Sequence, residues 1–90
     1  MDTNARLVRT NTALTTPVEE ELVMFDTEAG KYYGLNEVAT AIWNRLQNPQ
    51  TIGSLINSLT AEFEISEEQC RKEVRQFLSD MINRGLVEES

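Results

Sequence analysis

The sequence predicts a single α+β domain in which a small antiparallel sheet precedes three helices. β-prone runs gather in the first half of the chain, and apolar residues at helical spacing fill the second half. The length of 90 residues leaves no room for a second independent core. We therefore expect one domain over residues 1–90, with its core at about 6–88. The order of three strands followed by three helices fits a winged helix-turn-helix, in which the sheet forms the wing.

Three strands are predicted in the first half. Residues 6–9 form a plausible first strand, and a polar, threonine-rich connection is expected to follow through Pro17. Residues 21–25 and 31–35 are the second and third β-prone runs. About five residues separate them and end in Gly30, which predicts a hairpin whose loop uses a positive φ angle at that glycine.

The first two helices have recognisable boundaries. One is expected to begin after Asn36, a good N-cap residue, and to end at Asn48-Pro49, because the residue before a proline is pushed out of the helical region. The next is expected to begin after Thr51. Their apolar faces consist of Val38, Ala39, Ile42, Trp43 and Leu46 in the first, and of Ile52, Leu55, Ile56, Leu59 and Phe63 in the second.

The third helix has the clearest end signals. Ser66 and Gln69 fit a capping box, in which each side chain bonds the backbone N–H of the other residue. Gly85 is placed to end the helix in a left-handed conformation, with Leu86 folding back onto Met81. The apolar face consists of Cys70, Val74, Phe77, Leu78, Met81 and Ile82.

Composition argues against several classes of function. A net charge of −7 and a pI near 4.4 disfavour a nucleic-acid-binding surface. The absence of histidine removes the commonest general base and the commonest metal ligand. The acidic runs at 19–21 and 62–68 lack the alternating ligands of a calcium loop, so we interpret them as solvated faces. We expect no catalytic residue and no metal ligand.

The sequence also bears on the cellular location. The longest apolar runs, such as residues 22–25, are too short to cross a membrane, and the polar start is unlike a secretory signal peptide. Cys70 is a lone cysteine and has no partner for an internal disulfide, so we expect a buried, inert thiol in a cytoplasmic protein.

The most informative segment runs from Gly30 to Asn36, a short strand with two adjacent tyrosines that stops at a helix cap. The informative residues of the chain are Gly30-Lys31-Tyr32-Tyr33-Gly34-Leu35-Asn36, Ile42-Trp43, Leu46, Thr51-Ile52, Leu55, Leu59, Phe77-Leu78 and Gly85-Leu86. In these residues the chain resembles the PqqD-like family, the leader-recognition domains of ribosomally made, post-translationally modified peptides. The resemblance covers about residues 6–88, and in length and hairpin sequence it is most like the stand-alone leader-binding proteins of lasso-peptide pathways.

The resemblance implies a non-catalytic protein that binds the leader of a precursor peptide and presents the core to partner enzymes. In lasso-type systems these partners are a leader peptidase and an ATP-dependent macrocyclase. We expect no cofactor; the acidic charge and the short apolar runs further predict that neither nucleic acid nor a membrane is a partner. The leader of such a family adds as a strand beside the third strand and packs against the third helix. That mode suits an edge strand, whose unpaired N–H and C=O groups an extended peptide satisfies. The residues expected to bind the peptide are Lys31, Tyr32, Tyr33, Gly34, Leu35, Arg71, Val74, Arg75, Phe77, Leu78 and Met81.

Several of these residues admit other interpretations. Either tyrosine could face the groove while the other is solvated or in the core. The apolar residues of the third helix could be plain core, groove or both. For Arg71 and Arg75 we favour a solvated face, with Arg71 pairing Glu67 or Glu68, over contact with acidic leader residues at the groove rim. Contact with DNA phosphates is the weakest interpretation.

The sequence is also compatible with other functions. A PqqD-like chaperone for a radical-SAM maturase, acting on a quinone cofactor or a thioether peptide, belongs to the same family. A winged-helix DNA-binding regulator and a bare interaction module belong to other classes.

Overall fold

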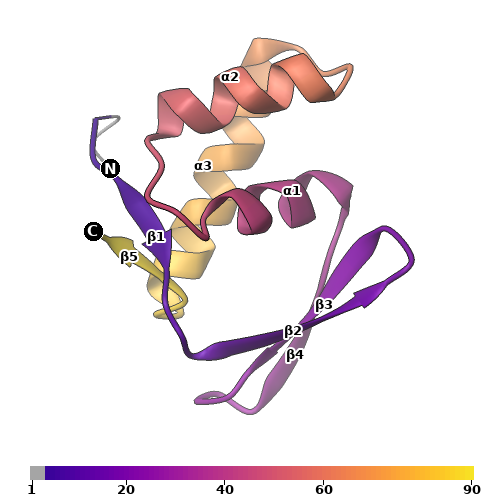
Figure 1. The fold of residues 1–90 in the computed structure, drawn as a ribbon, viewed down its shortest axis with the longest axis vertical. Helices are drawn as coiled ribbons and strands as arrows, with labels where there is room; N and C mark the ends of the chain where they lie inside the picture. Colours follow the sequence, from indigo (N-terminus) through magenta and orange to yellow (C-terminus); the bar gives the residue numbers. More distant parts are fainter. Residues whose placement is uncertain (1–3) are drawn as a thin grey trace.

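The computed structural model describes residues 4–90, so the first three residues of the predicted domain lie outside it. Figure 1 shows the helices on one side of the molecule and a twisted three-stranded sheet on the other, with α1 between α2 and the sheet. The α+β class is confirmed, whereas the narrower winged helix-turn-helix assignment stays a prediction. The strands are β1 (Leu7–Arg9), β2 (Ala13–Val18), β3 (Glu21–Asp26), β4 (Lys31–Leu35) and β5 (Val87–Glu89), and the helices are α1 (Glu37–Arg45), α2 (Ile52–Glu62) and α3 (Glu67–Asn83).

The three-stranded antiparallel sheet has the order β2-β3-β4. The predicted number of strands in this sheet is right, but its first strand is wrong. The segment expected to be a connection through Pro17 contains β2, whose threonines are β-branched and suit a pleated edge. Most of β2 is exposed, so it lacks the alternation of apolar and polar residues that would have revealed it. Pro17 is compatible with β2 because this strand lies at the edge of the sheet.

The strand predicted at residues 6–9 exists as β1, but it belongs to a different sheet. β1 pairs antiparallel with β5, so the two ends of the described chain lie side by side (Figure 1). Leu7 is 1% exposed and anchors this pair in the core. β5 was not predicted, because three residues are too few to show a pattern.

The N-caps predicted at Asn36 and Ser66 are confirmed, and the second helix begins after Thr51 as predicted. Asn36 Oδ1 accepts a hydrogen bond from the Ala39 N–H at 2.9 Å, and Thr51 and Ser66 cap α2 and α3 in the same way. The reciprocal half of the capping box at Ser66 is wrong, because the Gln69 side chain donates to Glu73 Oε1 at 3.4 Å instead.

The C-terminal ends of the helices agree in part with the sequence. α1 ends at Arg45, before the predicted end at Asn48-Pro49. α3 ends as predicted: Gly85 has a φ angle of +73°, and the Leu86 N–H donates to the Met81 carbonyl at 2.9 Å. The predicted positive φ angle at Gly30 is also confirmed, at +68°.

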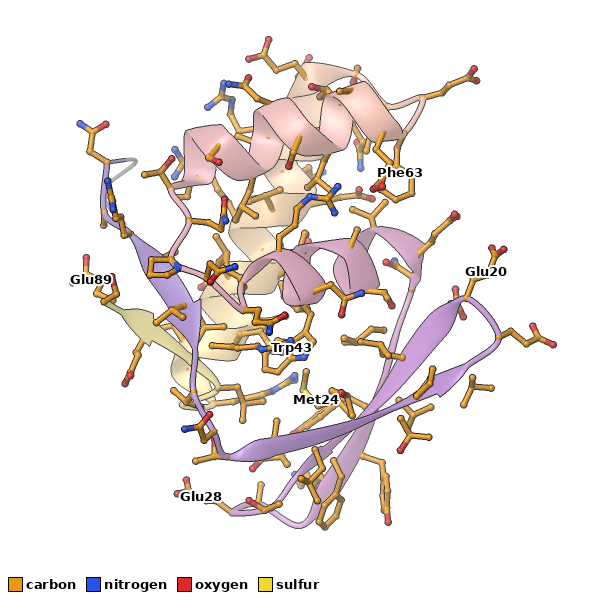
Figure 2. The ribbon with its side chains drawn as sticks, in the orientation of Figure 1. Glu20, Met24, Glu28, Trp43, Phe63 and Glu89 are labelled. Carbon is orange, nitrogen blue, oxygen red and sulfur yellow. The ribbon has the colours of Figure 1, made fainter. Side chains whose placement is uncertain are left out.

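The core lies between the helices and the inner face of the sheet. Trp43, which is 2% exposed, and Met24, which is 0% exposed, lie in the layer between α1 and the sheet (Figure 2). This position confirms the prediction that Trp43 is a core residue. In residues 4–90, no helix is both long enough and apolar enough to cross a membrane.

Candidate functional site

The strand β4 has one free edge. It pairs with β3 on one side, and within residues 4–90 no strand pairs with its other side. The prediction that this strand lies at a sheet edge is therefore confirmed. No atom lies within 4 Å of the position that a Cβ at Gly34 would take, so the fold itself does not require glycine there. Close approach of another backbone at Gly34 stays a prediction.

The two tyrosines of β4 point to opposite faces of the sheet, as alternation along a strand requires. Tyr32 lies on the outer face, is 73% exposed and packs its ring 4.7 Å from that of Phe25. Tyr33 lies on the inner face with Leu35 and is half-buried. The guanidinium carbon of Arg84, the C-cap of α3, lies 4.1 Å from the centroid of the Tyr33 ring. Tyr33 is thus the tyrosine that faces α3, a point the sequence left open.

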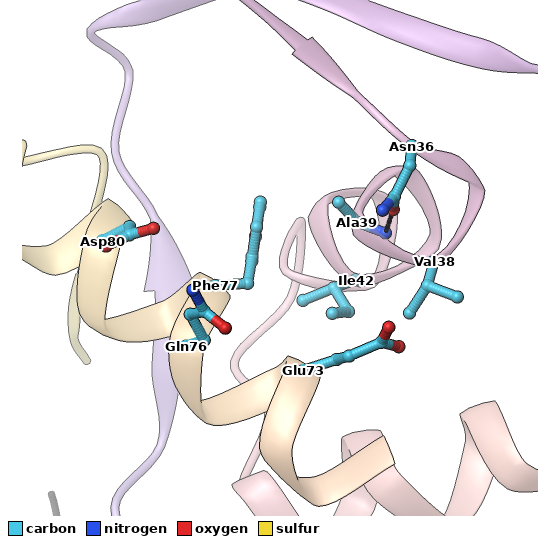
Figure 3. A pocket seen from close by; sticks show the side chains of 8 residues that line it. All are labelled: Asn36, Val38, Ala39, Ile42, Glu73, Gln76, Phe77 and Asp80. Carbon is cyan, nitrogen blue, oxygen red and sulfur yellow. Dashed lines mark hydrogen bonds between the residues drawn. The ribbon is translucent and has the colours of Figure 1, made fainter. Parts of the chain in front are cut away.

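A hollow of about 290 Å³ adjoins the end of β4, between the first turn of α1 and the middle of α3. Figure 3 shows the ring of Phe77 projecting from α3 into the space that faces α1. Phe77 is half-buried and packs against the core at its base. The residues that line the hollow are Asn36, Val38, Ala39, Ile42, Glu73, Gln76, Phe77 and Asp80.

The other apolar residues predicted on α3 lie in the core. Val74 and Leu78 are 0% exposed and Met81 is 2% exposed, and none of them lines this hollow. Of the four apolar residues expected to form the groove, the structure brings only Phe77 to its surface. The other three support the groove from beneath.

The two arginines predicted at the groove rim lie on a different side of α3. At 100° per residue, Arg71 and Arg75 are separated from Phe77 and Glu73 by a third to a half of the helix circumference. Arg71 bonds Glu67 Oε1 at 3.1 Å, as the solvated-face interpretation predicted. Both arginines line a separate hollow near the start of α3. Neither arginine lines the hollow beside β4, and their contact with acidic leader residues stays a prediction.

Sequence reasoning missed the polar half of the site. Along one side of α3 lie Glu73, Phe77, Asp80 and Arg84, at positions i, i+4, i+7 and i+11. This spacing is visible in the sequence beside the apolar stripe, and it marks a mixed stripe that a search for apolar residues passes over. Asn36 was assigned only as a helix cap, yet it also lines the hollow.

The remaining reactive group plays no part in this site. Burial, and then the nearby Glu73 carboxylate, raise the pKa of the Cys70 thiol, which keeps it protonated and unreactive. In the part of the chain that the structure describes, no three His, Cys, Asp or Glu side chains are grouped so that they could hold a metal ion.

The sequence profile of the family described as "Coenzyme PQQ synthesis protein D (PqqD)" matches residues 21–87. No curated protein matches the chain significantly.

Two solved structures share the fold. One is described as "TbiB1 in Complex with the TbiA(beta) Leader Peptide", with a TM-score of 0.78, 22% identity, and coverage of 90% of this chain and 94% of that one. The other is described as "Lasso peptide synthetase B1 complexed with the leader peptide", with a TM-score of 0.76, 18% identity, and coverage of 91% and 96%.

Proposed function

This chain belongs to the PqqD family, and from that premise we propose that it binds the leader segment of a ribosomally made precursor peptide. It catalyses no reaction itself and presents the rest of the peptide to maturation enzymes. The observation that carries the proposal is the free edge of β4 next to a hollow into which Phe77 projects. An edge strand supplies main-chain hydrogen bonds, and an adjoining hollow supplies side-chain selection.

The edge of β4 is better suited to accept a strand than the edge of β2. Pro17 lies within β2 and has no N–H, and in an edge strand the proline nitrogen faces away from the sheet. Proline on an edge is one of the features that prevent strand addition. β4 contains no proline, and its inner face adjoins the last turn of α3 through Tyr33 and Arg84.

We assign the peptide to the lasso class. Both structural neighbours are described as complexes with leader peptides, and each covers nearly the whole of this chain. The maturation enzymes would then be a leader peptidase and an ATP-dependent macrocyclase. The family description favours a second candidate of the same kind, a chaperone for the precursor of a quinone cofactor and its radical-SAM maturase.

The test is a fluorescence-polarisation titration with labelled leader peptides of both classes, at two salt concentrations. Saturable binding of a lasso-type leader at micromolar affinity or tighter, changing little with salt, is expected. Tighter binding of a quinone-cofactor leader would replace the lasso assignment with the second candidate. No binding of any leader by a folded sample would refute leader recognition.

Strand addition has its own test. In an antiparallel pair, alternate residues of each strand point their N–H groups toward the partner. Single N-methylations along the tightest-binding leader should therefore weaken binding at every second residue of one short segment and leave the residues between unaffected. Uniform tolerance of N-methylation would contradict strand addition while leaving leader binding intact.

A further inference from the structure

The hollow beside β4 contains a carboxylate oxygen without a partner. Glu73 Oε2 is buried and accepts no hydrogen bond from the described residues. Its other oxygen accepts only a long hydrogen bond, 3.4 Å, from Gln69. In Figure 3 the Glu73 carboxylate extends from α3 towards the side chains of Val38 and Ile42 on α1. A carboxylate beside apolar groups is unfavourable unless a donor or a cation reaches it.

The other residues that line the hollow do not provide that donor. Asn36 and Gln76 carry amide N–H groups, yet neither donates a hydrogen bond to Glu73 Oε2. Asp80 adds a second carboxylate, and no lysine or arginine lines the hollow. The hollow therefore combines apolar walls with a net negative charge.

Beyond the hollow, the same side of α3 carries the opposite charge at Arg84. Arg84 lies eleven positions after Glu73, about 16 Å along the axis of α3. An extended peptide covers that length in about five residues, which is the length of β4 itself. Arg84 contacts Tyr33 in the middle of β4, while the hollow adjoins Asn36 just after its end. α3 therefore passes β4 with its anionic part just beyond the C-terminal end of the strand and its cationic part beside the middle of the strand.

We infer that the peptide bound along β4 carries a lysine or arginine whose side chain enters the hollow and pairs with Glu73. This inference rests on the proposed function and names the chemistry that the site selects. The aliphatic stem of the residue packs against Phe77 and Val38, and its charged group reaches the unpartnered carboxylate oxygen.

The opposite charges of Glu73 and Arg84 then fix the direction in which the peptide binds. A strand that places its basic residue in the hollow places a residue about three to five positions away near Arg84, where an acidic side chain is favoured. A reversed strand would bring each charge to the wrong end. Main-chain hydrogen bonds alone would accept either direction.

The test combines peptide and protein variants. The tightest-binding leader of the panel is resynthesised with each lysine or arginine replaced in turn by norleucine, which keeps an unbranched aliphatic chain and removes the charge. Each peptide is titrated against the wild-type chain, Glu73→Gln and Glu68→Gln. Glu68 lies on another side of α3, so its substitution changes the net charge equally and serves as the matched control. Circular dichroism checks that each variant is folded, and Asp80→Asn provides a second, exposed substitution in the same hollow.

At one basic position of the leader, replacement by norleucine is expected to lower the affinity about tenfold, both for the wild-type chain and for Glu68→Gln. The same replacement should cost less than about twofold with Glu73→Gln, and Asp80→Asn should give an intermediate loss. Equal losses in Glu73→Gln and wild type at every position, or a tightest-binding leader without any sensitive basic residue, would overturn this inference and leave leader binding standing. If no leader binds, the proposed function falls and this inference falls with it.

Discussion

The helices and the three-stranded sheet differ in how far they bury their side chains. α1, α2, α3 and their caps contribute most of the buried apolar residues, whereas the sheet contributes only Met24 and Leu35 to that core. Three of the four large apolar side chains that are exposed within residues 4–90 lie in the sheet: Leu14, Val18 and Tyr32. Folding therefore depends mainly on the helices, and the sheet is left with free edges and a face available for contact. This difference predicts that stability and binding can be altered separately.

The largest effect is expected from the core of α3. Leu78→Ala removes a side chain that is 0% exposed, and such a substitution costs about 2–5 kcal/mol in the free energy of unfolding. For a domain of this size that is a large part of the total stability. Urea denaturation measures the change, and Ser79→Ala, at the exposed neighbouring position, serves as the control with a shift within about 0.5 kcal/mol. Similar midpoints for the two variants would contradict the view that α3 carries the core.

Substitutions beside the edge of β4 should weaken leader binding, in contrast to the loss of stability expected in the core. Tyr33→Ala and Phe77→Ala are each expected to weaken leader binding by about tenfold, because they remove half-buried aromatic groups beside the proposed strand. Arg45→Ala is the control: Arg45 pairs with Glu62 at 3.0 Å on the side of α1 that faces α2. Polarisation titrations with folded samples measure the three affinities. Equal affinities would refute the assignment of the groove.

The helices could be predicted from the sequence because each of their signals is local. A cap residue and its N–H partner lie three positions apart, as for Asn36, Thr51 and Ser66, and the apolar stripe repeats within a single helix. The hairpin of β3 and β4 was equally accessible, since its loop ends in a glycine with positive φ.

The elements that were missed depend on partners far away in the sequence. β1 pairs with β5 about eighty residues later, and neither strand has a local pattern that identifies the other. β2 is an exposed edge, so no burial pattern is imposed on it. The packing of the whole domain determines such non-local pairing. A single sequence contains little information about that packing.

The candidate site, like the fold, could be predicted only in part. The edge strand followed from the order of elements, and Phe77 followed from the apolar stripe. The direction in which each residue of α3 points did not follow, because a broad apolar stripe does not show which part meets the core. Val74, Leu78 and Met81 lie at its centre, Phe77 at one border and Arg71 at the other.

A smaller change in stability is expected at the N-cap of α3. Ser66→Ala removes the side-chain acceptor of the Gln69 N–H, a bond of 3.1 Å, and should cost about 1 kcal/mol. Ser66→Gly is the matched variant, since glycine at an N-cap costs only a few tenths of a kcal/mol. Thermal and urea denaturation compare the two. An equal loss for both variants would show that the hydroxyl does not act through capping.

A weak dependence of stability on pH is expected from Cys70. Because burial raises the pKa of this thiol in the folded chain, the unfolded chain releases the proton first as the pH rises. The contribution to stability is full below the unfolded pKa of about 8.5 and is lost progressively above it. Urea midpoints between pH 7 and pH 10 should fall less steeply for Cys70→Ala than for the wild type. Parallel slopes would contradict this assignment.

The smallest effect is expected at the two arginines of α3 that face away from the groove. Arg71 is engaged with Glu67, and with Arg75 it lines a hollow that contains no residue of β4 or α1. Arg71→Ala and Arg75→Ala should therefore change leader affinity by less than about twofold, since an exposed ion pair contributes little and neither side chain lines the hollow beside β4. The same titrations at low salt are the most sensitive measurement, because screening is weakest there. A loss of more than about fivefold at low salt would mean that the bound leader continues around α3 beyond Glu73, and the surface that recognises it would then extend to both sides of the helix.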